Sequence, residues 1–435
     1  YDGSSRFAKD HRYAFFPSVS AAWRISEENF WQPLKGWWND MKIRGSYGSL
    51  GNQVMDDLGN FPYLATYGTN SSYNYLINGS KPVIVKAPGL VAPDFTWETV
   101  TQMDFGFDAS FLNNRLTGTF DWYRRNTKDM LVAGATLPAT LGASVPKSNS
   151  ADMKTIGWEL SLGWNDRLEN GFSYWVKGVL SDYQATITKY AGNDAGFYSQ
   201  SDGDGKYYVG QKIGEIWGYH SNGLFQSDDE AATIDQSELY AGKWGAGDVK
   251  YEDLDNDGKI TKGEETIYNP GDKSIIGNKT PRYQFGITVG FDYKNFDFEM
   301  FWQGTGKRDY MLSGAQFWGF TSQWDVPYTP ALDYWTETNT DAYFPRPGWQ
   351  NGGNRVTSDR YLQSAAYGRL KNLTVGYTIP KNLTTKWGIS RLRLYVTGEN
   401  LLTITPLNDA FDPETLGGMT YPINRKVAIG LNLTL

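Results

Sequence analysis

Cysteine is absent from this chain of 435 residues, and histidine occurs only twice, as His11 and His220. The absence of Cys excludes thiol nucleophiles and thiolate metal ligands, and two histidines far apart in the sequence leave little for a His-based metal centre. Clusters of Lys and Arg are missing too, and the net charge is −7. This acidic balance speaks against a nucleic-acid groove, because phosphate contacts need clustered basic residues. No catalytic constellation stands out, so we expect no enzyme activity.

Long apolar runs are also lacking. No stretch of about 18 apolar residues is present, so the sequence predicts no transmembrane helix. The mean hydropathy of −0.52 does not exclude a membrane protein, because a β-barrel strand turns only every second residue toward lipid. Aromatic residues make up 16% of the chain and glycine occurs 48 times. Both features favour an all-β protein, in which aromatic residues suit strands and glycine suits turns and tight packing.

Apolar residues alternate with small or polar residues in several segments. In segment 283–293, Tyr, Phe, Ile, Val, Phe and Tyr alternate with Gln, Gly, Thr, Gly and Asp. Segments 103–111, 156–164 and 427–435 follow the same pattern. Each run has about the 9–11 residues that a tilted strand needs to cross a bilayer.

This pattern predicts strands that are joined alternately by short and long connections. The long connections are 50–96, 127–152, 185–280, 306–365 and 402–423, whereas the others are short apart from 25–38, which is of middling length. Outer-membrane barrels have short periplasmic turns and long extracellular loops, and this parity places the C-terminus on the periplasmic side. The eleven predicted strands are 13–24, 39–49, 97–111, 115–126, 153–165, 171–184, 281–293, 296–305, 366–379, 391–401 and 424–435.

A soluble β-sandwich or β-helix also shows alternation, because one of its faces is buried. Sandwich strands are usually shorter, about 5–6 residues, and lack this parity of loop length. We therefore expect part of a transmembrane antiparallel up-and-down β-barrel with long extracellular loops. Single-chain bacterial barrels normally have an even number of strands and leave no edge open in lipid. The remaining strands are accordingly expected upstream of Tyr1.

Short motifs follow one another along the whole chain. They include RYAFFPSVSAAW at 12–23, MKIRGSYG at 41–48, DWY at 121–123, GDVKYEDLDNDG at 247–258, LKNLTVGY at 370–377 and FDPE at 411–414. In this order they resemble motifs of the SusC/RagA-type TonB-dependent transporters of Bacteroidota. The chain departs from that family at its end, where the family often has Phe and this chain has Leu435.

The resemblance implies a transporter of the bacterial outer membrane, with no enzyme activity. Family members have barrels of about 22 strands, so residues 1–435 correspond to the C-terminal part of the barrel. The plug domain, the N-terminal strands and the TonB box are expected outside this segment. The family imports oligosaccharides or peptides with a SusD-like surface lipoprotein as a lid, and TonB supplies the energy. We expect import of a glycan, with peptide import as the alternative.

One local motif has metal-binding spacing. The segment 253–264 fits the twelve-residue calcium loop, in which Asp253, Asp255, Asp257, Lys259, Thr261 and Glu264 occupy the ligand positions. Gly258 would permit the sharp turn, and Ile260 would anchor the loop against its neighbours. The sequence thus predicts a structural Ca²⁺ site, with a metal-free acidic turn as the alternative. No cofactor is otherwise expected.

Aromatic residues in the long connections are candidates for stacking on sugar rings, because sugars present apolar faces to flat rings. We expect substrate contacts from Phe317, Trp318, Phe320, Trp324 and Trp244, and Tyr73, Tyr75, Phe197 and Tyr207 form a wider set. Packing between loops, or contact with a lid protein, is the alternative for each ring.

Two further function classes remain open from the sequence. One is a soluble carbohydrate-binding or adhesin-like β-protein with a Ca²⁺ loop, and the other is a passive porin. Detergent-dependent extraction and heat-modifiable migration on a gel separate a barrel from the soluble alternative. A plug and a TonB box in the full-length gene separate an energised importer from a porin.

Overall fold

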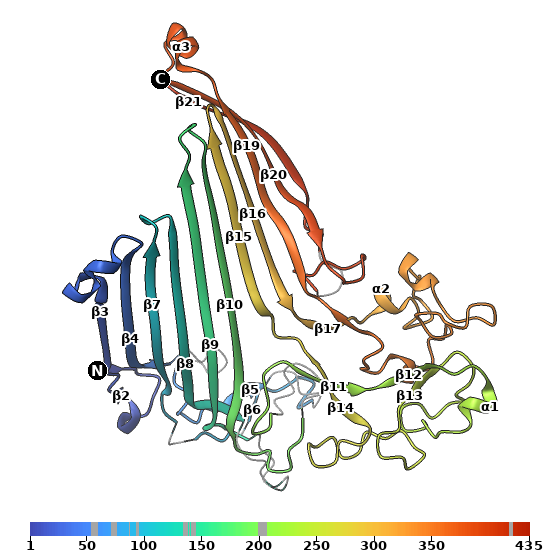
Figure 1. Ribbon diagram of the computed structural model, residues 1–435. Helices are drawn as coiled ribbons and strands as arrows, with labels where there is room; N and C mark the ends of the chain where they lie inside the picture. The colour runs from blue at the N-terminus through green and yellow to red at the C-terminus, as the bar shows by residue number, and fades with distance from the viewer. Residues whose placement is uncertain are drawn as a thin grey trace.

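The computed structural model describes residues 1–53, 60–70, 76–86, 88–92, 95–133, 138, 140, 145–198, 207–416 and 421–435. Eleven of its strands form one antiparallel sheet, in which each strand pairs with the next sheet strand along the chain. Figure 1 shows this sheet as a curved wall that runs from β3 to β21. The strands are β3 (Ser18–Arg24), β4 (Trp38–Asn52), β7 (Glu98–Phe111), β8 (Leu116–Ala133), β9 (Lys147–Arg167), β10 (Ser173–Tyr190), β15 (Arg282–Tyr293), β16 (Phe296–Lys307), β19 (Tyr367–Thr378), β20 (Arg391–Ile404) and β21 (Lys426–Thr434).

The predicted parity of the connections is confirmed. Short turns and the C-terminus lie at the upper end of the wall in Figure 1, and the long loops lie at its lower end. The turn between β7 and β8 is made by Leu112, Asn113 and Asn114, with φ values of 56°, 58° and 63°. Asn tolerates this left-handed backbone better than most residues, which suits it to so tight a reversal.

The two faces of the sheet differ as the alternation predicts. On β21 the side chains of Val427, Ile429 and Leu431 are 71%, 84% and 62% exposed. These residues alternate with Ala428 and Gly430 along the strand. An exposed apolar row of this kind is the surface that lipid covers on a membrane barrel, and the opposite face lines the lumen.

Several predicted strand boundaries were wrong. Segment 13–24 is not one strand, because β2 (Tyr13–Ala14) pairs with β1 (Asp2–Gly3) and the sheet strand begins only at Ser18. Pro17 lies between them, and proline has no N–H to donate to a strand ladder. At the loop end, β8 and β9 continue beyond the predicted limits at 126 and 153. Beyond the bilayer both faces of a strand meet water, so its apolar and polar residues no longer need to alternate. The backbone pairing of β8 with β9 does not depend on that pattern and therefore continues.

The long connections carry small elements of their own. The additional strand pairs are β5 (Gly68–Asn70) with β6 (Ile84–Lys86), β11 (Glu215–Tyr219) with β14 (Lys273–Asn278), β12 (Ser221–Leu224) with β13 (Val249–Tyr251), and β17 (Asp309–Met311) with β18 (Leu362–Ser364). Short helices are α1 (Asp228–Ala231), α2 (Ala315–Trp318) and α3 (Lys381–Thr384), and 3-10 turns occupy Lys9–His11, Ile25–Glu27, Asn29–Leu34, Thr329–Leu332, Gly352–Arg355 and Thr385–Trp387. Within the described ranges, no helix is long and apolar enough to cross a membrane.

Candidate functional site

Three long loops share one hydrophobic core at the loop end of the sheet. We call residues 207–281, 308–366 and 405–416 the loop cluster. The ring centroid of Phe317 lies 5.1 Å from that of Phe344 and 6.2 Å from that of Phe411, so one buried ring joins two of the loops. Burying a side chain of this size stabilises a fold by about 1.5–3 kcal/mol. The buried core consists of Tyr219, Leu224, Val249, Tyr251, Ile260, Leu312, Phe317, Trp318, Phe344, Tyr361, Ala365, Leu407, Phe411 and Leu416.

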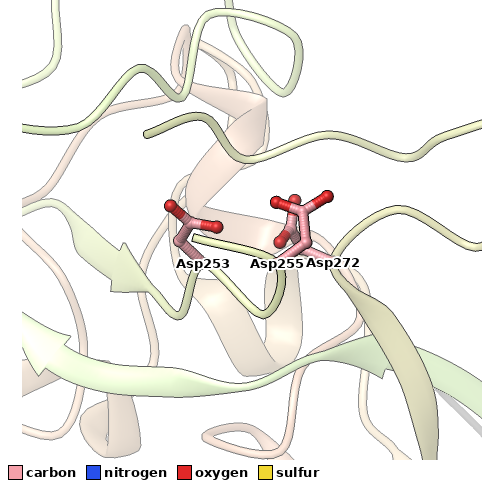
Figure 2. Close-up of side chains that lie close together, drawn as sticks. All are labelled: Asp253, Asp255 and Asp272. Atoms are coloured by element: carbon pink, nitrogen blue, oxygen red, sulfur yellow. The ribbon is translucent and has the colours of Figure 1, made fainter. Parts of the chain in front are cut away.

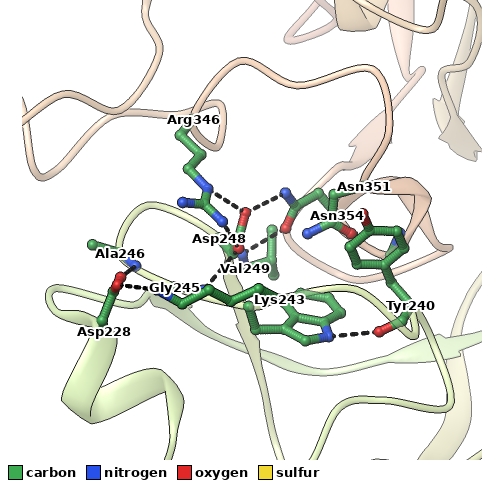
Figure 3. Close-up of polar contacts among 12 residues, drawn as sticks. Asp228, Tyr240, Lys243, Gly245, Ala246, Asp248, Val249, Arg346, Asn351 and Asn354 are labelled. Atoms are coloured by element: carbon green, nitrogen blue, oxygen red, sulfur yellow. Dashed lines mark hydrogen bonds and ion pairs between the residues drawn. The ribbon is translucent and has the colours of Figure 1, made fainter.

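A buried carboxylate joins the first two loops of this cluster. Asp248 is 0% exposed, and Arg346 donates to it from Nε at 2.9 Å and from Nη2 at 2.6 Å. The side-chain amide of Asn354 and the N–H of Gly245 complete its set of donors, at 2.8 Å and 3.0 Å. Figure 3 shows these groups converging on Asp248 from different segments. A bidentate pair of this type fixes geometry as well as charge, so it sets how the two loops lie against each other.

The backbone next to Asp248 requires glycine. Gly247 has a φ of +83°, and a Cβ at this position would lie 2.5 Å from the ring of Trp335. The carbonyl oxygen of Gly247 accepts a hydrogen bond from the N–H of Arg346 at 2.8 Å. The left-handed backbone and the lack of a side chain therefore bring Arg346 within reach of both Gly247 and Asp248.

A second ionic contact ties the last loop to the sheet. Arg369 on β19 is 2% exposed as a whole residue, and its Nη2 donates to Asp412 at 2.6 Å while its Nη1 lies 3.0 Å from Glu414. Arg369 is in register with Gln303 and Thr403 on the neighbouring strands, and Gln303 is in register with Gly286 of the polar face. The loop after β20 thus bends over the lumenal side of the sheet.

The predicted calcium loop folds as a tight acidic turn with one unpredicted neighbour. Asp253, Asp255 and Asp272 each place a carboxylate oxygen within 4.8 Å of the others. Figure 2 shows the three side chains close together. Asp272 is 1% exposed and accepts hydrogen bonds from the N–H groups of Leu254 at 2.8 Å and Thr261 at 2.7 Å. Three converging carboxylates are the ligand type that Ca²⁺ prefers.

The predicted carboxylate ligands Asp257 and Glu264 do not belong to this group of three carboxylates. Asp257 accepts a hydrogen bond from the N–H of Lys259 at 2.8 Å, and Glu264 is exposed on the following turn. Ile260 is fully buried, as expected for the anchor of the loop. The third carboxylate beside Asp253 and Asp255 is therefore Asp272, whereas the spacing predicted Glu264 as a ligand. Calcium binding stays a prediction.

The carboxyl groups of this turn have shifted pKa values. Burial opposes ionisation of Asp253, but N–H donors from Gly258, Asn256 and Asp257 outweigh it and lower the pKa of Asp253. Burial raises the pKa of Asp255, and the negative charges of Asp257, Asp272 and Asp253 raise it further. A bound cation would relieve this repulsion, because it favours the charged form of every carboxylate around it.

The predicted aromatic contacts occupy very different environments. Phe317 is 0% exposed and Trp318 is 9% exposed, so their burial favours the packing alternative over contact with a ligand. Trp244 is half-buried and donates its ring N–H to the carbonyl oxygen of Tyr240 at 3.0 Å. Phe320 lies at intermediate depth, whereas Trp324 is 83% exposed. Of the wider set, Phe197 and Tyr207 lie in the connection between β10 and β15, as Trp244 does. Tyr73 and Tyr75 lie outside the described residues.

The structure also brings together residues that the sequence did not connect. His220 Nδ1 lies 2.7 Å from Asp359, and its Nε2 lies 2.7 Å from the hydroxyl of Ser274. The N–H of Ser221 donates to the second oxygen of Asp359 at 3.0 Å. Because Asp359 and His220 belong to different loops, this chain of hydrogen bonds is a further link within the loop cluster. No spacing in the sequence could have revealed it, since 139 positions separate the two residues.

Comparisons with known proteins agree with this architecture. Residues 1–401 match the family model described as "TonB dependent receptor-like, beta-barrel". The chain is 30% identical over 472 residues to TonB-dependent receptor P3 of Formosa agariphila, an alignment that covers 99% of this chain and 43% of that relative. It is 28% identical over 440 residues to TonB-dependent receptor SusC of Bacteroides thetaiotaomicron, covering 100% of this chain and 41% of that relative.

A solved structure shows the same fold. The structure described as "Structure of the RagAB peptide transporter" matches with a TM-score of 0.76 at 22% sequence identity. The match covers 99% of this chain and 44% of that chain. The chain thus spans less than half the length of the curated relatives and of the solved structure that it matches.

Proposed function

The chain belongs to the TonB-dependent receptor-like β-barrel family of the outer membrane, and on this premise we propose that it forms the C-terminal part of a SusC/RagA-like importer of oligosaccharides. The proposal assigns it no enzyme activity. Residues 1–435 would supply barrel wall, a polar lumenal face and the loops around the outer mouth.

The sheet is the observation that carries the proposal. Its eleven strands follow one another without a crossover, and most of them have 12–21 residues. Strands of this length exceed the roughly 9–11 residues that cross a bilayer, so they reach beyond the membrane on the loop side. The proposed transport path runs along the polar face of this wall, and the apolar row on the other face meets lipid.

The loop cluster supports a role at the mouth. The ion pair of Asp248 and Arg346 joins the first two loops of the cluster. Arg369 on β19 holds the third loop to the sheet through Asp412 and Glu414. A connected rim keeps contact residues at defined positions, which lowers the ordering cost when a ligand or a partner binds.

The proposed partners follow from the family. A SusD-like surface lipoprotein would close the mouth above the loop cluster, and TonB would act on a plug carried outside residues 1–435. RagAB, named as a peptide transporter, has the same fold at 22% identity, so peptide import is the outcome that competes with glycan import. The exposed rings of the loops suit sugar faces, and this favours glycan import.

Uptake measurements with the full-length transporter test the proposal. A strain that lacks its gene is expected to lose uptake of particular labelled oligosaccharides while still taking up labelled oligopeptides. The wild-type gene should restore this uptake, and deletion of TonB should remove it again. Loss of peptide uptake alone would establish the competing substrate, and unchanged uptake of both substrates would overturn the proposal.

A further inference from the structure

An aromatic row on the lipid-facing side of the sheet marks the outer edge of the membrane. Trp122 on β8 is in register with Phe105 on β7 and with Trp158 on β9. Phe105 is 53% exposed, as a ring that faces lipid should be. Tryptophan gathers at the level of the lipid head groups, because its ring is apolar and its N–H is polar. The residues that follow Trp122 toward the long loops therefore lie in the head-group layer of the outer leaflet.

Beyond this row the same face of β8 and β9 carries cations. Arg124 lies two residues after Trp122, about 7 Å further along the strand, and Lys128 follows on the same side by alternation. Asn126, between the two cations, is in register with Lys154 on β9. Long side chains at opposite or diagonal positions of neighbouring strands lie within reach of one another. Arg124, Lys128 and Lys154 therefore form one group, which we call the basic cluster.

Apolar side chains border the basic cluster on the membrane side. Arg124 is in register with Met103 on β7 and with Ile156 on β9, which are 43% and 39% exposed. A charge on the lipid face of a barrel destabilises it at the middle of the bilayer but costs little near the interface. The cluster thus places positive charge directly beside surface that meets acyl chains.

The charges of the basic cluster are not neutralised within the part of the chain that the structure describes. None of its three residues forms an ion pair there, and Arg124 donates only to the side-chain oxygen of Asn126, at 3.3 Å. Three donors of Lys and five of Arg leave most of the N–H groups of the cluster for other acceptors.

The neighbouring carboxylates of this face have other partners. Asp182, in register with Trp158, accepts a hydrogen bond from Nη2 of Arg282 at 2.6 Å. Asp152 lies two residues beyond the cluster on β9, where it accepts the backbone N–H of Asp129 at 2.9 Å. The side of the cluster that faces the membrane is therefore left with three cations and no paired acid among the described residues.

We propose that the basic cluster binds a phosphate group of a glycolipid in the outer leaflet, while the apolar side chains below it pack on the acyl chains. Arg and Lys are the usual ligands of phosphate oxygens, and basic clusters beside a membrane recognise anionic lipid head groups. The inference follows from membership of an outer-membrane barrel family and does not depend on which substrate is imported.

The position of the cluster selects against soluble anions. Acidic sugars and peptides in the transport path meet the opposite, lumenal face of the same strands. An anion that reaches Arg124 from the lipid side must share the membrane with Met103 and Ile156, so it carries acyl chains of its own. A phosphorylated glycolipid matches both features of this surface, which are unneutralised cations and adjacent apolar side chains.

Reporter fluorescence in nanodiscs tests the site on the full-length transporter. An environment-sensitive dye is attached to Thr101→Cys, which is in register with Asn126, in a protein without other cysteines. The discs contain phosphatidylcholine and a rising fraction of lipid A, either phosphorylated or dephosphorylated. The phosphorylated form should half-saturate the signal at a fraction at least about tenfold lower. Arg124→Gln and Lys154→Gln should each weaken its binding about fivefold, because one cation beside an anionic membrane contributes about 1 kcal/mol.

A matched variant separates the site from the general effect of charge. Arg125→Gln makes the same charge change one residue away, but Arg125 lies on the lumenal face and donates to Gln102 at 2.9 Å. It should leave the response to lipid A unchanged, and Arg124→Lys should keep most of it. Normal heat-modifiable migration would show that each variant has folded.

Two kinds of result would overturn the inference. The first is an equal response to both forms of lipid A, or an equal effect of Arg124→Gln and Arg125→Gln. The second is the same signal from millimolar inorganic phosphate, or from the lid protein in discs without lipid A, because the cluster would then serve another ligand.

Discussion

Trp175 on β10 covers Gly290 on β15, its partner in the strand register. A Cβ on Gly290 would lie 2.1 Å from the indole ring, so the ring occupies the space that any side chain would need. The pair lies on the polar face of the sheet, where Gly290 alternates with Val289 and Phe291. The glycine is therefore explained by a particular cross-strand neighbour as well as by general use of small residues in the lumen.

Replacing Gly290 by Val should hinder assembly of the barrel. The new side chain collides with Trp175, and overpacking of this kind typically costs about 1–3 kcal/mol. The fraction of full-length protein that shows heat-modifiable migration should fall. Gly178→Val on β10 is the control, because a Cβ there would meet nothing within 4 Å. Equal assembly of the two variants would contradict the proposed packing.

The link between Asp248 and Arg346 gives a second prediction. Asp248→Asn removes the charge that Arg346 faces. Because the Arg346 side chain is 40% exposed, we expect the loss of charge-assisted hydrogen bonds to cost about 1.5–3 kcal/mol. Hydrogen exchange in segments 245–250 and 344–355 of the full-length protein should accelerate, while exchange in β15 should not. Asp229→Asn, at an exposed residue of α1, provides the control. Unchanged protection after Asp248→Asn would show that the loops are held together by other contacts.

Calcium is expected to stabilise the acidic turn. Chelation should lower the protection of segment 253–272 against hydrogen exchange, and Asp255→Ala should make this protection independent of Ca²⁺. Asp272→Asn should have a similar effect, because Asp272 belongs to the carboxylate cluster, whereas Glu264→Gln should matter less. If the protection of segment 253–272 against hydrogen exchange is the same with and without chelator, the segment is an acidic turn that binds no calcium.

The same turn should respond to acid in a defined direction when calcium is removed. Asp253 has a lowered pKa, so its contribution to stability is present above the ordinary Asp value of about 3.9 and is lost as the pH falls through the lowered value. Asp255 has a raised pKa, so its charged form opposes folding at neutral pH and protonation relieves this effect first. Protection measured from neutral pH downward should hold or rise slightly before it falls. Asp253→Asn should remove the fall, and a steady loss of protection from neutral pH would contradict these directions.

The sequence predicted the wall of the barrel well because a membrane imposes a simple rule on it. Every second residue of a barrel strand meets lipid, so the alternation of apolar and polar residues in segment 283–293 identifies it as a membrane-spanning strand. The prediction failed at segment 13–24, where the side chains alternate across Pro17. Proline has no N–H for the strand ladder, so the sheet strand begins only after it.

The loop cluster was less predictable because its contacts are not periodic. Phe317 and Trp324 lie seven positions apart in one aromatic-rich segment, yet one ring is 0% exposed and the other 83%. Asp272 lies beside Asp253 and Asp255 only because the turn folds back on itself. Arg346 and Asp248 are far apart in the sequence, so their ion pair could not be predicted from spacing. Aromatic content and acidic spacing located the region, but only tertiary packing shows which member of each set is available to a ligand.

The central claim is that the alternation along these strands separates lipid from lumen. The most direct test introduces single cysteines along β15 (Arg282–Tyr293) of the full-length protein in its membrane. Residues 1–435 contain no native Cys that would react with the probes. Probes confined to lipid should react at 285, 287, 289 and 291, and water-soluble probes should react at 284, 286, 288 and 290. Reaction of both sets with water-soluble probes, or a pattern without period two, would contradict the account.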